Sequence, residues 1–236
     1  MGLLKLAILW RYLNNMNVWQ KAKIIKSSQA ASDIKSIVVK PEKWIPHRAG
    51  QHYELRISDT DISRKYSVVS SVGQTAVLEF GVQLIAGGVL SPKIWELVPG
   101  DEIEIRGPLG ESFFWEESIP GPLVLIGVGS GITPLISIYF SYLNKYPQAK
   151  CIFIMSAKDE SRIMRYDLLK NILLTRLTSV EGRIDLPFLQ KNIGSLAKTK
   201  NAMCYICGPG NFIDDIVDYV LELGFAEENV RSDRFI

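Results

Sequence analysis

The sequence predicts a two-domain β plus α/β protein, in which an antiparallel sandwich or barrel precedes a parallel sheet covered by helices. Short β-rich runs separated by Gly, Pro, Asp and Ser clusters recur through residues 18–116, a rhythm typical of antiparallel strands. From residue 120 onward, apolar strand-like runs alternate with helical patterns, which is typical of a parallel sheet. With 236 residues, the chain is long enough for two domains that each bury a core.

The first half contains six predicted strands, each bounded by turn-forming residues. In this half, Gly87 and Gly88 precede Ser91 and Pro92, and a Ser-Pro pair indicates a helix start because the first helical turn needs no backbone donor. The N–H groups of such a start make this loop a candidate anion site. The predicted strands lie near residues 22–27, 34–40, 52–58, 65–70, 76–84 and 102–106.

The second half alternates strands with helices. Residues 117–122, which contain two prolines and a glycine, form the expected linker, so the predicted domains are residues 18–116 and 123–236, after an extension of residues 1–17. Strands are predicted at residues 123–127, 151–156, 171–175 and 203–206, and helices near residues 134–144, 159–169 and 211–223.

The extension has three interpretations. Leu3 to Trp10 is apolar except for Lys5, and this run is far shorter than the roughly 20 residues of a membrane span. The segment is a short helix packed on the body, a weak membrane contact, or an upstream extension of a chain that starts at Met16. We expect no stable membrane insertion.

Composition argues against several functions. Lys and Arg number 27 against 25 Asp and Glu, a balance that does not indicate nucleic-acid binding. Three cysteines support neither a disulfide framework nor an iron–sulfur cluster, so we expect a reducing, cytoplasmic setting. The odd spacing of Cys204 and Cys207 in a predicted strand sends their side chains to opposite faces, and the chain has only two histidines. We therefore expect no metal site.

A glycine-rich turn follows the strand at residues 123–127. Gly129, Ser130 and Gly131 form the turn, and Thr133 and Pro134 are a predicted cap and opening of the next helix. A strand, a glycine turn and a helix N-terminus together suit a phosphate group. The spacing differs from the Rossmann pattern because an isoleucine stands at the third glycine position. A turn without a ligand is the alternative.

The strand near residues 65–70 carries a second pattern. In a strand, Arg64 and Tyr66 share one face and Ser67 points to the other. Arginine offers a fork for phosphate, tyrosine a flat ring for stacking, and serine a short donor or acceptor. These residue types suit a phosphorylated aromatic cofactor, whereas in isolation the pattern favours a solvated strand with a half-buried tyrosine.

Five motifs in one order resemble the ferredoxin–NADP reductase superfamily over residues 18–236. They are R-x-Y-S-x-x-S, G-G-V-x-S, G-D-x-I-x-x-x-G-P-x-G, G-x-G-x-G-I-T-P and C-G-P. The resemblance implies an antiparallel β-barrel that holds FAD, less often FMN, followed by an α/β domain that binds NADPH or NADH. The predicted linker agrees with that division.

The resemblance also assigns roles in flavin binding. Arg64 pairs with the flavin pyrophosphate, Tyr66 stacks on the isoalloxazine, and Ser67 hydrogen-bonds near flavin N5. Phe235 covers the flavin edge or, alternatively, seals the last strand. The backbone donors to the pyrophosphate are Gly88, Val89, Leu90 and Ser91.

On the nucleotide side, the resemblance implies that Ser130 lies where flavin and nicotinamide meet. Cys207 matches the family cysteine beside nicotinamide C4, with Gly208 and Pro209 shaping its pocket; a buried small side chain is the alternative. Tyr66, Ser67 and Cys207 are thus the predicted catalytic residues. The predicted phosphate contacts are Gly129, Gly131 and Thr133, with Thr175, Arg176 and Arg183 as candidates for the 2′-phosphate of NADPH.

The function implied is that of a flavoprotein that takes hydride from NAD(P)H and passes electrons to a separate acceptor, such as a ferredoxin or an oxygenase component. Two alternatives remain open: a reductase that uses free flavin as substrate, and an electron-transfer subunit of a larger complex. The sequence identifies neither the acceptor, the preferred nucleotide nor the oligomeric state.

Overall fold

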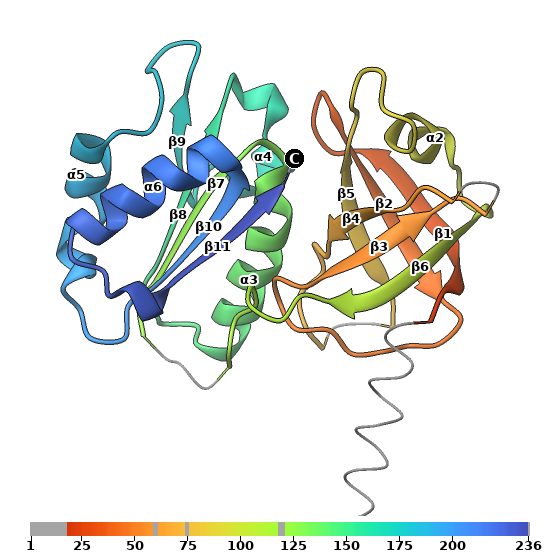
Figure 1. Ribbon diagram of the computed structural model, residues 1–236, viewed down its shortest axis with the longest axis horizontal. Coiled ribbons are helices and arrows are strands. Elements are labelled where there is room, and N and C mark those ends of the chain that lie inside the picture. Colours follow the sequence, from red (N-terminus) through yellow and green to blue (C-terminus); the bar gives the residue numbers. More distant parts are fainter. Residues whose placement is uncertain (1–17, 59–60, 74–75, 118–120, 236) are drawn as a thin grey trace, which may run out of the picture.

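A computed structural model describes residues 18–58, 61–73, 76–117 and 121–235, and it places two sheets side by side (Figure 1). The extension predicted at residues 1–17 lies outside the described residues. The residues near 120 where we expect the domains to meet separate the last strand of the first sheet from the first strand of the second. The exact domain boundaries remain predictions.

The first sheet is antiparallel, as predicted, and has the strand order β4-β3-β6-β1-β2-β5. Its two edges meet at a single bridge between Val68 and Phe80, supported by a hydrogen bond from Val69 N to Glu79 O of 2.8 Å. The sheet therefore curls into a barrel-like shape without a continuous closing ladder. Its strands are β1 (Gln20–Gln29), β2 (Ile34–Pro41), β3 (His52–Arg56), β4 (Arg64–Ser67), β5 (Leu78–Gln83) and β6 (Glu102–Leu109), with the helix α2 (Ser91–Glu96) between β5 and β6.

The second sheet is parallel, with the order β11-β10-β7-β8-β9. Its strands are β7 (Leu123–Val128), β8 (Cys151–Ala157), β9 (Leu173–Leu177), β10 (Met203–Pro209) and β11 (Val230–Phe235). Its helices are α3 (Ile132–Lys145), α4 (Tyr166–Leu169), α5 (Leu186–Ala197) and α6 (Gly210–Glu222). The two-domain fold class predicted from the sequence is thus confirmed.

Alternation along β7 and β10 divides the second domain into two cores. Leu123 and Leu125 pack with α3, whereas Val124 and Ile126 pack with α5 and α6. The helix α3 therefore covers the face turned toward the first sheet, and α5 and α6 cover the other face (Figure 1). Successive side chains of a strand point to opposite faces of the sheet, and helices cover both faces, so both sets of side chains are buried.

Three segments differ from the prediction. The helix expected at residues 159–169 is reduced to a 3₁₀ turn at residues 160–162 and the single turn of α4, because Arg165 adopts a left-handed conformation that interrupts the helix. The helix α5 and the strand β11 were not predicted. A signal for α5 was present, since Asp185 accepts a hydrogen bond from Phe188 N and Pro187 stands in the first turn.

The seam between the domains, meaning the surface where the first sheet meets α3 and the second sheet, is buried and apolar at its centre. Ile34 and Val69 from the first domain belong to the same core cluster as residues of α3. The hydrogen bonds that cross the seam include one from Ser137 Oγ to Ser70 O (2.8 Å) and one from Tyr205 Oη to Phe114 O (3.0 Å). The two domains are therefore packed together rather than tethered only by the linker.

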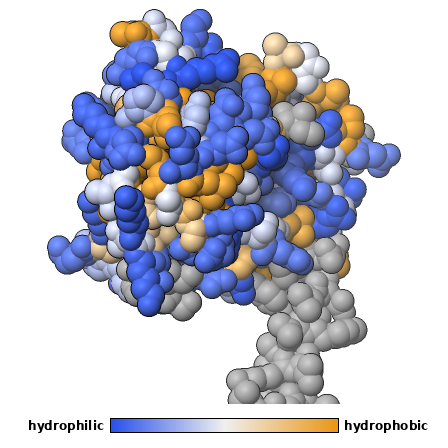
Figure 2. Space-filling view, turned by 60° about the vertical axis from the view of Figure 1, so that its left-hand side comes forward, coloured by the Kyte–Doolittle hydropathy of each residue, from blue (hydrophilic) through white to orange (hydrophobic). Residues whose placement is uncertain are grey.

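The outer surface of the second domain is largely hydrophilic, with separate apolar patches (Figure 2). Leu174 of the edge strand β9 and Val180 beyond it are among the exposed apolar side chains. Within the described residues, no helix has both the length and the apolar character that a membrane crossing requires.

Candidate functional site

A cavity of about 660 Å³ opens at the seam and is lined from both domains. Its volume lies within the range of about 300–1,000 Å³ that is usual for small-molecule sites. The first domain contributes His52, Glu54, Ser63, Arg64, Lys65, Tyr66, Ser67, Gly81 and Gln83. The second contributes Ser130, Thr133, Pro134, Cys207, Asp233, Arg234 and Phe235. Seven of the predicted site residues are among them.

One wall is the edge strand β4. Cross-strand pairing with β3 sets Tyr66 opposite Tyr53 and Ser67 opposite His52, so Tyr66 and Ser67 project to different sides of the sheet, as the strand period predicts. The ring of Tyr66 packs against the core of the first domain, and burial raises the pKa of its phenol to about 12, with Arg64 acting in the opposite direction. Tyr66 is therefore a neutral, apolar platform at pH 7.

The opposite wall begins at the glycine turn. Val128 ends β7, Gly129–Gly131 form a 3₁₀ turn, and α3 begins at Ile132 with Gly131 as its N-cap. The prediction that Thr133 caps this helix is wrong: its Oγ1 donates to the Ser130 carbonyl at 2.9 Å, because the turn tightens one residue earlier than expected. Ser130 and Thr133 nevertheless both line the cavity.

Gly131 lets this turn touch the end of β10. A Cβ atom on Gly131 would lie 2.3 Å from the Cys207 carbonyl oxygen, so the residue must be glycine for the two backbones to meet. Gly208, just behind Cys207, is similarly confined, since its Cβ would lie 2.6 Å from Val128 Cγ1. These contacts bring Ser130 and Cys207 to the same end of the sheet.

Cys207 is almost fully buried, with 2% of its surface exposed. Burial, reinforced by the neighbouring Asp233 carboxylate, raises the pKa of the thiol well above its ordinary value, so the sulfur is a protonated, weakly polar surface. Cys204 lies in the core on the other face of the sheet, as its odd spacing from Cys207 predicts. The arrangement suits packing against a ring, not nucleophilic attack.

Three groups of predicted residues lie outside the lining of this cavity. In the loop at residues 87–91, the Gly88 amide donates to Ile85 O (2.9 Å), Ser91 Oγ accepts from Ile85 N (3.1 Å), and Leu90 is buried in the core. The assignment of this loop to a pyrophosphate remains a prediction. The same holds for the roles of Gly129, Gly131, Gly208 and Pro209, which are close in sequence to lining residues but do not line the cavity.

The candidate 2′-phosphate residues form a separate cluster at the end of β9. Arg176 lies over the Phe188 ring at 5.1 Å, approaches Asp185 at 3.4 Å and donates to the Arg183 carbonyl at 3.3 Å. Thr175 precedes Arg176 in the strand. The structure thus brings Thr175, Arg176 and Arg183 together, away from the seam cavity.

Sequence reasoning missed the polar side chains that share a face with Ser67. Register places His52 opposite Ser67 and Glu54 opposite Lys65, and all four line the cavity. The period of two along these strands could have identified them. Asp233 also faces this region; burial raises the pKa of its carboxyl, and the Lys65 ammonium partly counteracts that shift.

We expect His52 to make stability depend on pH. Burial, aided by Lys65, lowers the pKa of its imidazole to about 4 from an ordinary 6.5, whereas Glu54 acts in the opposite direction. The unfolded chain then binds more protons between these values, so stability rises with pH across that window. At pH 5 the loss relative to pH 7.5 amounts to about 2 kcal/mol. Urea unfolding of the wild type and of His52→Asn tests this, because the two should differ in pH dependence; parallel curves would refute it.

The lining residues fit a flat heterocyclic ring bearing a phosphate. Tyr66 offers an apolar face, Ser67 and Ser130 offer hydroxyl groups, and Arg64 offers a charged fork at the mouth. Gly131, which has no side chain, lies directly against the Cys207 backbone beside the cavity.

Comparison with known proteins agrees with this geometry. Residues 21–114 match the family described as the oxidoreductase FAD-binding domain. A flavohemoprotein of Bacillus subtilis is 31% identical over 247 residues, covering 92% of this chain and 60% of the relative. An Amycolatopsis cytochrome P450 reductase superposes with a TM-score of 0.81 at 20% identity, covering 92% of this chain and 70% of that one. A ferredoxin reductase in carbazole 1,9a-dioxygenase gives a TM-score of 0.77 at 19% identity, covering 93% and 70%.

The chain has a two-domain fold similar to that of these solved proteins, and its first domain matches the oxidoreductase FAD-binding domain family. Its five motifs resemble those of the ferredoxin–NADP reductase superfamily, and both the family match over residues 21–114 and the fold are consistent with that resemblance. It spans 60%, 45% and 61% of the lengths of the first three curated relatives that it matches.

Proposed function

We propose that this chain is an NAD(P)H-dependent flavin oxidoreductase that takes hydride from NAD(P)H onto FAD and passes electrons to a separate acceptor. The observation that carries the proposal is the seam cavity, in which Arg64, Tyr66 and Ser67 of one domain face Ser130 and Cys207 of the other. A site shared by two domains can bring two aromatic ligands together, one bound by each domain.

FAD, when bound, accepts two electrons as hydride and can release them singly. The chain's own residues position and shield the rings. Arg64 holds a phosphate, Tyr66 gives the flavin a neutral face, and Ser67 and Ser130 donate hydrogen bonds that fix its edge. Cys207 and Phe235 exclude water from the place where the rings meet. Such positioning can supply about 7–11 kcal/mol toward the reaction.

The acceptor is proposed to be a separate one-electron protein. Several relatives are named as components of larger systems, among them the reductase subunit of an aromatic O-demethylase and the reductase component of a phenol 2-monooxygenase. An iron–sulfur cluster needs four thiolates and these 236 residues contain three cysteines, so an acceptor cluster would lie outside them. The same count supports a reducing, cytoplasmic compartment.

Purification and anaerobic reduction test the proposal. We expect a yellow protein with one FAD per chain, which NADH or NADPH bleaches within seconds. A colourless protein that reduces added free flavin would favour the flavin-reductase alternative. Retained flavin that neither nucleotide reduces would contradict the proposal and favour a subunit of a larger complex.

We predict that Arg176→Ala weakens NADPH use selectively. Loss of a charge-assisted contact to the 2′-phosphate costs about 1.5–3 kcal/mol, which corresponds to a rise in the KM for NADPH of about tenfold to a hundredfold. The KM for NADH should change less than about twofold, because NADH lacks this phosphate. Steady-state kinetics with an artificial acceptor measure both values. Equal effects on the two nucleotides would remove Arg176 from the phosphate site.

A further inference from the structure

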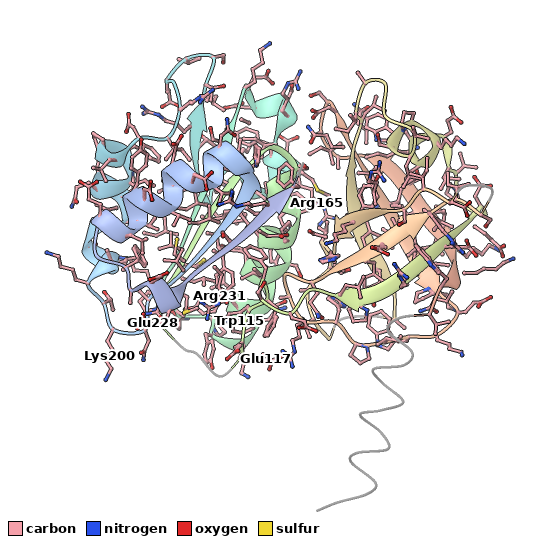
Figure 3. All side chains as sticks on the ribbon, viewed as in Figure 1. Trp115, Glu117, Arg165, Lys200, Glu228 and Arg231 are labelled. Atoms are coloured by element: carbon pink, nitrogen blue, oxygen red, sulfur yellow. The ribbon has the colours of Figure 1, made fainter. Side chains whose placement is uncertain are left out.

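Residues 159–169, which we call the strap, lie in the connection between β8 and β9 and form hydrogen bonds to the first domain. It belongs to the second domain, yet Ser161 O accepts from Ser32 N at 2.7 Å and Arg165 N donates to Ala30 O at 2.9 Å. Both partners lie in or beside the turn between β1 and β2. Figure 3 places Arg165 at the seam between the two domains.

The side chain of Arg165 reaches a buried carboxylate. Its guanidinium forms an ion pair with Glu79 of β5, and the same carboxylate oxygen accepts from Ser36 Oγ at 2.5 Å. Glu79 is 9% exposed, so these partners replace most of the water around its carboxylate. The Arg165 side chain is 34% exposed and that of Glu79 12%, so the pair is partly buried, and removing the guanidinium would leave the Glu79 carboxylate without its charged partner.

The backbone of Arg165 is held as firmly as its side chain. Its φ of 57° and ψ of 33° lie in the left-handed region, which a non-glycine residue keeps only when its surroundings hold it there. The Arg165 amide donates across the seam, and its carbonyl accepts from Leu168 N at 2.9 Å. In this conformation Arg165 is the N-cap of α4, and its guanidinium contacts Glu79.

The same strand that carries Glu79 also lines the seam cavity. Gly81, two residues further along β5, is part of the lining, and a Cβ atom on it would lie 2.5 Å from Thr133 Cγ2 and 3.0 Å from Met164 Sδ. Met164 directly precedes Arg165. The ion pair therefore holds the strap next to the part of β5 that packs against Thr133 at the start of α3.

We propose that Arg165 is a positioning residue: by its ion pair with Glu79 it sets the separation of the two cavity walls, and so of the flavin and the nicotinamide. This inference rests on the proposed function. The apolar core of the seam and the Ser137 and Tyr205 hydrogen bonds keep the domains together without it. Loss of the ion pair thus changes alignment rather than assembly, and a misplacement of about 1 Å can slow a reaction about a hundredfold.

Anaerobic stopped-flow reduction of the FAD-loaded full chain tests this role. For Arg165→Met we expect the limiting rate of flavin reduction to fall at least tenfold, while flavin content and the Kd for NAD(P)H stay within about twofold. The long-wavelength charge-transfer absorbance of the flavin–nicotinamide pair should weaken in parallel. Arg165→Lys, which keeps the charge, should recover part of the rate. A rate within twofold of wild type in a folded Arg165→Met protein would overturn the proposal.

The matched control is Arg162→Met. Arg162 lies in the same strap and also pairs across the seam, with Asp33 at 3.2 Å, but this pair is more exposed: its side chains are 45% and 21% exposed, against 34% and 12% for Arg165 and Glu79. An exposed ion pair contributes little, so this variant should reduce at the wild-type rate. Equal slowing in both variants would assign the effect to general loosening of the strap and overturn a specific role for Arg165.

A double-mutant cycle separates this inference from the proposed function. If wild type itself retains no flavin, the proposed function fails, and thermal unfolding of Arg165→Met, Glu79→Gln and the double variant then judges the ion pair alone. We expect the double variant to lose markedly less stability than the sum of the single variants. Additive losses would overturn the coupling across the seam.

Discussion

Replacing Gly131 with alanine is expected to disrupt the candidate site more than any other small change. The added methyl carbon would lie 2.3 Å from the Cys207 carbonyl oxygen and 2.8 Å from its carbon, and both neighbours are backbone atoms. Neither β10 nor the start of α3 can move without disturbing the parallel sheet. We expect a loss of about 3 kcal/mol in unfolding free energy, at the upper end of overpacking effects. Nucleotide-driven flavin reduction should be lost with it.

Gly129→Ala is the matched control for that variant. Gly129 lies in the same turn with φ of 57°, and a Cβ atom there meets no atom within 4 Å. We expect a stability loss of at most about 1 kcal/mol, because left-handed strain is partly offset by the lower entropy of the unfolded chain. Urea denaturation of the three proteins measures the difference. Equal losses in both variants would show that the turn is not in contact with Cys207.

Arg64→Ala is expected to release the flavin. Arg64 lies exposed at the cavity mouth at the start of β4, and the side chain bonds only locally to Ser63 O at 2.8 Å among the contacts described. A charge-assisted bond to a phosphate contributes about 1.5–3 kcal/mol, so the Kd for FAD should rise about tenfold to a hundredfold. Fluorescence titration of the apoprotein measures this value.

Lys21→Ala serves as the control for Arg64→Ala. Lys21 lies on β1 of the same sheet, away from the cavity lining, and its ion pair with Glu102 is exposed. Its removal lowers the positive charge of the domain equally but should leave the Kd for FAD unchanged. Comparable weakening in both variants would point to a general charge effect rather than a contact between Arg64 and the cofactor.

Periodicity predicted much of the site because strands impose alternation whatever surrounds them. Tyr66 and Ser67 project to different sides of β4, and Cys204 and Cys207 lie in different cores. The glycine turn could likewise be predicted, since glycines that directly follow an apolar run indicate a turn at the end of a strand. Local residue patterns were therefore sufficient to locate the walls of the cavity.

Tertiary contacts decided what periodicity could not predict. The strap resembles a helix in its apolar pattern, yet cross-seam bonds hold Arg165 in the left-handed region and limit the helix to one turn. Thr133 has the residue type of a cap but bonds back to Ser130 instead. Arg165 itself could not be found from sequence, because its partner Glu79 lies 86 residues away.

The most direct measurement is a crystal structure of the chain with FAD and a non-reducible nicotinamide analogue. We predict that the isoalloxazine lies against Tyr66, with the pyridine ring between it and Cys207. A seam cavity that holds neither ring, or rings bound elsewhere on the chain, would contradict the account.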